Sequence, residues 1–113
     1  MTEYVEKYLG RMNDPSGAAY LKGPCGDSME FYLEIKDNRI KEVKYFTEGC
    51  EATKACGAMT AHLSSGKTLE EALCISAGEV RKNITALPPD HLHCTILAVS
   101  VFYRALADYL LKE

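Results

Sequence analysis

The stretch that decides the fold is MEFYLEIKDNRIKEVKYF, residues 29–46. Its first half alternates apolar and polar residues, as a strand with one buried face requires. The apolar positions are Met29, Phe31, Leu33 and Ile35. Asp37-Asn38 is typical of a tight hairpin turn. In the second half Ile40 and Val43 would point to opposite faces of an unbroken strand. We therefore predict two antiparallel strands with a β-bulge near Lys41-Glu42.

Working outward from this hairpin, a short strand is expected at 18–22 and a first helix before Gly10. After Cys50 the apolar period becomes helical. The expected buried face of that helix comprises Ala52, Ala55, Cys56, Met59 and Leu63. A last helix should begin after the two prolines and run to about Leu111. This order predicts an α+β fold, an antiparallel meander with helices packed on one face.

Two short helices are expected between these long ones, each marked by a capping box. In a capping box, a serine or threonine precedes a glutamate by three positions. Thr68 with Glu71 has this spacing, and so does Ser76 with Glu79.

Composition restricts the function. The chain has 113 residues, 47% of them hydrophobic and 26% charged, which suits one domain over residues 1–113. Its net charge is −3 and it has no basic run, which argues against nucleic acid. The longest apolar stretch, 95–103, is cut by Arg104, so no membrane span is expected. The N-terminus lacks the apolar region of a signal peptide. We therefore expect a cytoplasmic protein.

Five cysteines need an explanation in such a chain. In a reducing compartment a disulfide framework is not expected. Cys25 lies in a glycine-rich turn, and Cys50 and Cys94 lie where helices are expected to begin. Element boundaries are where ligands and nucleophiles usually lie, whereas core residues prefer the middle of an element. The alternative for each is a small buried hydrophobic residue. We assign that role to Cys56 and Cys74, which lie among apolar neighbours.

Asp27 and His93 add a carboxylate and an imidazole beside the boundary cysteines. Unpaired N–H groups at a helix start favour the thiolate form of Cys94. Such a set of side chains can hold zinc in a tetrahedron or an iron–sulfur cluster. A carboxylate binds cluster iron more weakly than a thiolate does. Three thiolates with a weaker fourth ligand therefore indicate a site that releases its cargo.

Three motifs resemble, in order, the cysteine motifs of the IscU/NifU-type iron–sulfur cluster assembly scaffolds. They are GPCGDSM at 23–29, FTEGCEA at 46–52 and ALPPDHLHCTILA at 86–98. The resemblance covers about residues 10–110 and implies a three-stranded antiparallel sheet flanked by helices. It also implies a transient cluster bound by Cys25, Asp27, Cys50, His93 and Cys94, with zinc as an alternative occupant.

The resemblance further implies a carrier that is not an enzyme. It would receive sulfur from a cysteine desulfurase on Cys94 or Cys50 and pass clusters to acceptor apoproteins. Many members have Val and Lys where this chain has Asp90 and His91. The resemblance therefore does not extend to recognition by the family's dedicated chaperone, and His91 becomes a candidate residue beside the ligands.

Two alternatives stay open, a zinc-dependent sulfurtransferase and a small structural zinc protein. The zinc-dependent branch carries an insertion between its second and third cysteines, and the spacing from Cys50 to Cys94 leaves no room for one. The run from Val99 to Phe102 is expected to add apolar surface, which suits a homodimer.

Overall fold

The computed structural model describes residues 2–23, 26–84, 87 and 89–112. The elements are α1 (Thr2–Tyr8), β1 (Gly17–Lys22), β2 (Ser28–Lys36), β3 (Arg39–Phe46), α2 (Glu51–Ser64), α3 (Leu69–Ala72), α4 (Ala77–Lys82), the 3₁₀ turn η1 (Pro89–His91) and α5 (His93–Lys112). The strands form one antiparallel sheet in the order β1-β2-β3. The α+β fold predicted from the sequence is confirmed.

The hairpin between β2 and β3 turns at Asp37 and Asn38, whose φ angles of 55° and 62° are left-handed. Two consecutive residues with positive φ give the turn that matches the twist of antiparallel strands. Asp and Asn tolerate this conformation better than other side chains do. The turn residues of the predicted hairpin are therefore the ones its geometry needs.

The predicted β-bulge is also present. Ile35 pairs with Ile40, whereas the preceding residue, Glu34, pairs with Glu42. The mismatch leaves one extra residue, Lys41, in β3. The bulge shifts the alternation by one position, so the apolar residues on both sides of it are buried.

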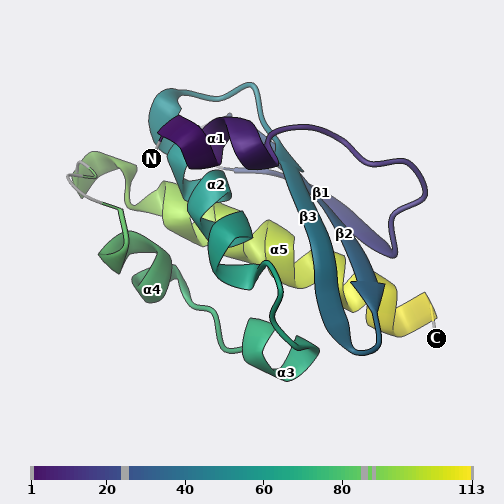
Figure 1. The fold of residues 1–113 in the computed structure, drawn as a ribbon. Helices are drawn as coiled ribbons and strands as arrows, with labels where there is room; N and C mark the ends of the chain where they lie inside the picture. The colour runs from purple at the N-terminus through teal and green to yellow at the C-terminus, as the bar shows by residue number, and fades with distance from the viewer. Residues whose placement is uncertain (1, 24–25, 85–86, 88, 113) are drawn as a thin grey trace.

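The helices α2 and α5 pack against the face of the sheet to which the apolar residues point, with α5 crossing the sheet diagonally (Figure 1). The ring of Phe31 in β2 meets the ring of Phe102 in α5 edge-on, with 5.8 Å between centroids. Two glycines allow the helices to approach closely. A Cβ atom on Gly17 would lie 2.3 Å from the carbonyl oxygen of Ala105, and one on Gly57 would lie 2.7 Å from the Tyr45 ring.

The buried side of α2 differs from the expected face. Cys56 and Met59 are buried as expected, but Ala52, Ala55 and Leu63 are only partly buried. The most buried positions of this helix include three hydroxyl residues, Thr53, Thr60 and Ser64. The difference arises because α1, the sheet, α4 and α5 all contact α2, so it has no single apolar stripe.

The loop between α2 and α5 contains one further correction. Cys74 is exposed, not buried as expected, because it lies in the turn after α3 and the following Ile75 enters the core instead. The Thr68 capping box has both of its hydrogen bonds. At α4 only one half forms, in which the Ser76 hydroxyl accepts a bond from the Glu79 N–H.

The apolar run of α5 lies inside the protein. Val99, Val101 and Phe102 are all buried, so the expectation that this run forms an exposed apolar surface is wrong. By length and composition alone, one helical segment, 89–112, could cross a membrane. Half of its apolar window is buried against the rest of the protein, as in the core helix of a folded domain.

Candidate functional site

Asp27 is positioned by the turn that joins β1 to β2. The N–H of Gly23 donates to the Asp27 carbonyl at 2.6 Å, and the N–H of Gly26 donates to the Gly23 carbonyl at 3.0 Å. Gly26 has a φ of 91°, which glycine adopts without strain. Cys25, the first cysteine of the expected ligand set, lies outside the described residues. Gly23 and Gly26, the described residues that flank this gap, are joined by the hydrogen bond given above.

Cys50 occupies the N-cap position of α2, with extended backbone angles, and its side chain is exposed. The segment leading to it is fixed by Thr47, whose hydroxyl donates to the Ser28 carbonyl and accepts from the Gly49 N–H. Gly49 lies against the neighbouring turn. A Cβ atom there would be 3.1 Å from Asp27 Cγ. The start of α2 therefore lies directly beside the turn that carries Asp27.

Cys94 is the second residue of α5 and is 1% exposed. The 3₁₀ turn at Pro89–His91 leads into the helix, and the Thr95 hydroxyl donates to the Leu92 carbonyl at 2.6 Å. His93, partly buried, has its Nε2 3.8 Å from Cys94 Sγ. The ring of His91 lies 6.2 Å from the ring of His93. The 3₁₀ turn and the start of α5 thus place two histidines and a thiol together.

One residue that the sequence did not single out joins these three segments. Thr53, fully buried in the first turn of α2, donates its hydroxyl hydrogen to Asp27 Oδ2 at 2.6 Å. The Thr53 Oγ1 atom also lies 3.5 Å from Cys50 Sγ and 3.5 Å from Cys94 Sγ. The two sulfurs can therefore be separated by no more than twice that distance. In the sequence, only the position of Thr53 three residues after Cys50, on the same helical face, could have indicated it.

The thiols of α2 have opposite electrostatic surroundings. The pKa of Cys50 is lowered, chiefly by the contact of its sulfur with the Thr53 hydroxyl and then by the Thr53 backbone N–H. Burial raises the pKa of Cys56 to about 12, and the nearby Cys94 and Cys50 add to the rise. Cys50 is therefore the readier of the two to form a thiolate, which is both the nucleophile and the metal ligand.

The structure brings Asp27, Cys50, His93 and Cys94 to one end of the molecule. Over the described ranges, no three Cys, His, Asp or Glu side chains are close enough to hold one metal ion together. The Thr53 hydroxyl lies between the carboxylate and the two sulfurs. Metal capture therefore needs a small movement of these side chains or a ligand from outside the described ranges.

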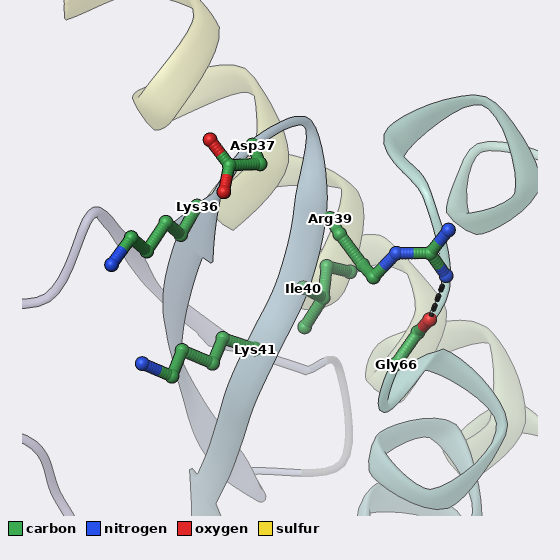
Figure 2. Close-up of a pocket in the computed structure, with 6 residues that line it drawn as sticks. All are labelled: Lys36, Asp37, Arg39, Ile40, Lys41 and Gly66. Carbon is green, nitrogen blue, oxygen red and sulfur yellow. Dashed lines mark hydrogen bonds between the residues drawn. The ribbon is translucent and has the colours of Figure 1, made fainter.

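A shallow pocket at the opposite end of β2 and β3 is unrelated to this site. Figure 2 shows its lining, which is Lys36, Asp37, Arg39, Ile40, Lys41 and Gly66. The Arg39 guanidinium donates a hydrogen bond to the Gly66 carbonyl there, at 2.6 Å. The lining contains no thiol or imidazole, so it lacks the soft ligands that iron and zinc prefer.

The fold and the site together define a class of protein, a small α+β domain that gathers thiols and a carboxylate at the starts of two helices. The family described as the NifU-like N terminal domain matches residues 6–113. The chain therefore belongs to this family, and the resemblance seen in its motifs is confirmed.

Relatives support the assignment. Iron-sulfur cluster assembly scaffold protein IscU 1 of Archaeoglobus fulgidus is 39% identical over 106 residues, covering 93% of this chain and 69% of that protein. The IscU scaffold protein of Haemophilus influenzae is 36% identical, covering 93% of this chain and 84% of that protein.

Solved structures share the fold. A putative iron-sulfur cluster assembly scaffold protein for the SUF system from Fervidobacterium islandicum has a TM-score of 0.77 at 22% identity, covering 93% of this chain and 92% of that one. A NifU-like protein from Brucella abortus has a TM-score of 0.73 at 15% identity, covering 98% and 92%.

Proposed function

We propose that this protein is a scaffold on which iron–sulfur clusters are assembled transiently and from which they pass to acceptor apoproteins. The observation that carries the proposal is the meeting of Asp27, Cys50 and Cys94 around one hydroxyl, that of Thr53. Thiolates bind iron strongly and a carboxylate binds it more weakly. A mixed set of this kind suits a cluster that must later leave.

The proposed ligand set is Cys25, Asp27, Cys50, His93 and Cys94. His93 is adjacent to Cys94 in the chain and its ring nitrogen faces the Cys94 sulfur. His91 lies beside His93 and is proposed to act on the ligands from outside the set. The N–H groups at the starts of α2 and α5 favour negative charge, which helps both helices to carry thiolates.

Sulfur would arrive as the persulfide of a cysteine desulfurase. In the proposed step a thiolate of the scaffold attacks the outer sulfur of that persulfide. A new S–S bond forms on the scaffold, the S–S bond of the donor breaks, and the donor cysteine leaves as a thiolate. Cys50 is exposed and can accept in the described conformation. Cys94 is buried and can accept the sulfur only after the residues that bury it move.

We further propose that the protein acts as a carrier in the cytoplasm, as a single domain without an enzymatic reaction of its own. Its partners would be the desulfurase and the apoproteins that accept clusters. Asp90 and His91 in the turn before α5 are proposed to remove recognition by the family's chaperone.

Anaerobic reconstitution tests the proposal. The purified protein is mixed with iron, cysteine and a desulfurase, and visible absorption is followed before and after an apo-ferredoxin is added. We expect absorption that appears on the scaffold and then decays as the ferredoxin is loaded. Cys74→Ala, which removes an exposed thiol outside the site, should behave like the wild type. Tight zinc with persulfide transfer would instead indicate a zinc-dependent sulfurtransferase, and zinc alone a structural zinc protein.

A further inference from the structure

The hydroxyl of Thr53 donates its hydrogen bond to a residue of the site, Asp27, and not to the backbone of its own helix. A buried threonine in a helix usually satisfies its hydroxyl with a backbone carbonyl of the preceding turn. Thr60 does so in the same helix, donating to the Cys56 carbonyl at 2.8 Å. Thr53 is equally buried, yet its hydroxyl donates to a carboxylate on a different segment, 26 positions away.

The packing around this hydroxyl leaves the Asp27 carboxylate little freedom. Gly49 lies against both residues, since a Cβ atom on it would be 3.1 Å from Asp27 Cγ and 3.1 Å from Thr53 Cβ. Asp27 itself belongs to a turn and has no helix or strand to orient its side chain. The bond from Thr53, at 2.6 Å, is short, as bonds to a charged acceptor are.

We propose that Thr53 is a positioning residue that holds the Asp27 carboxylate beside Cys50 and Cys94, so that an arriving metal meets carboxylate and thiolates together. This inference rests on the proposed function. A threonine hydroxyl has one hydrogen to donate, and here three acceptors lie within reach of it. When the metal takes the carboxylate oxygen, the hydroxyl can rotate toward either sulfur at 3.5 Å. It is then not left as a buried unpaired donor, which would cost free energy.

The test is binding of Co²⁺ alone to the metal-free protein, measured by the absorption of cobalt–thiolate bonds. Thr53→Val keeps the branched shape and removes the hydroxyl, and Thr53→Ser keeps the hydroxyl. We expect Thr53→Val to weaken Co²⁺ binding roughly ten- to a hundredfold, the range for losing a hydrogen bond to a charged group. Thr53→Ser should restore affinity to within about threefold of the wild type.

A double variant separates positioning from packing. If Thr53 acts through Asp27, then Thr53→Val should have no further effect in an Asp27→Ala background. Thr60→Val, which removes a buried hydroxyl from the same helix but away from the carboxylate, is the matched control and should bind like the wild type. Circular dichroism and thermal unfolding of each metal-free variant show whether it folds.

Wild-type Co²⁺ affinity in a folded Thr53→Val variant would overturn the inference. So would a double variant in which the losses of affinity from Thr53→Val and Asp27→Ala add. A wild-type protein that binds no Co²⁺ would overturn it as well. Because the Co²⁺ measurement needs neither sulfur nor a desulfurase, it gives its answer even if cluster assembly fails. Failure of the proposed function and failure of this inference are thus distinguishable.

Discussion

At the scale of single residues, the reactivity of the thiols in α2 follows from their surroundings. The pKa of Cys50 is lowered by its contacts with the hydroxyl and the backbone N–H of Thr53, whereas burial raises the pKa of Cys56 to about 12. At pH 7 a thiol with that pKa is a thiolate in only about one molecule in a hundred thousand. We expect iodoacetamide to modify Cys50 at least about tenfold faster than Cys56 in the folded protein.

Mass spectrometry of the labelled peptides measures both rates in one sample. Cys74, which is exposed, controls for access of the reagent, and denaturant should make the three rates similar. Equal rates for Cys50 and Cys56 in the folded protein would contradict the assignment of opposite surroundings.

Asp27 is expected to govern the release of a cluster as well as the binding of metal. Asp27→Ala removes the weakest proposed ligand and, with it, the position at which an acceptor's thiolate is proposed to exchange onto the cluster. Assembly should still occur, but transfer to apo-ferredoxin should slow by roughly tenfold, equivalent to about 1.4 kcal/mol in the barrier. Glu42→Ala, which removes an exposed carboxylate from β3, is the control. Faster transfer from Asp27→Ala than from the wild type would refute this role.

The residue scale also shows what sequence could and could not reveal about the site. The proximity of Cys50, Asp27 and Cys94 was predictable because reactive residues at element boundaries stand out from core residues. Thr53 was not, because a threonine inside a helix resembles any other until the fold brings Asp27 to it. Cys74 was assigned to the core because its neighbours in the sequence are apolar. Those neighbours do not show which side chains the turn after α3 directs toward solvent.

At the scale of elements, the local rules predicted the sheet better than the helices. A strand has one alternation and one buried face, so residues 29–46 predicted both the hairpin and the bulge. The helix α2 is contacted by several elements, so its burial is decided by the tertiary structure and not by an apolar stripe. The close approach of α5 to β1 at Gly17 is likewise a property of the packed elements.

Substitution of the packing glycines tests this contact between elements. Gly17→Ala and Gly57→Ala add a methyl group where backbone or ring atoms already lie within 3.0 Å. We expect each to lower the free energy of unfolding by about 1–3 kcal/mol, as overpacking does. At Gly78 in α4 the nearest atom that an added Cβ would meet is the Ser76 hydroxyl oxygen at 3.8 Å, so Gly78→Ala should instead stabilise by about 0.5–1 kcal/mol through helix propensity. Urea denaturation measures all three, and a neutral Gly17→Ala would contradict the close approach.

At the scale of the whole molecule, the two ends of the sheet differ in character. The hairpin end carries lysines and an arginine around an open pocket, whereas the other end carries the thiols, the carboxylate and the histidines. The core between them is continuous, and the ring of Phe31 contacts the rings of both Tyr45 and Phe102. Groups that titrate inside this core therefore act on the stability of the whole fold.

Two such groups make the fold sensitive to alkaline pH. Burial raises the pKa of Cys56 from 9.0 to about 12 and that of Tyr45 from 10.0 to about 12. Between these limits the unfolded chain loses both protons while the folded protein retains them, so unfolding is favoured as pH rises. The stabilisation is complete below about pH 9, where both forms hold the Cys56 proton, and is lost progressively up to about pH 12.

We therefore expect the free energy of unfolding to fall by at least about 1.4 kcal/mol, the value of one pKa unit, between about pH 8 and 11. Urea denaturation at several pH values measures the fall. Cys56→Ala lowers the starting stability by leaving a small cavity, but its decline should begin about one pH unit later, where Tyr45 starts to contribute. Tyr45→Phe should keep the early decline and lose the later one. Because exposed lysines and tyrosines titrate in all three proteins, the informative quantity is the difference between curves, and parallel curves for the wild type and Cys56→Ala would show that the Cys56 proton is not held by the fold.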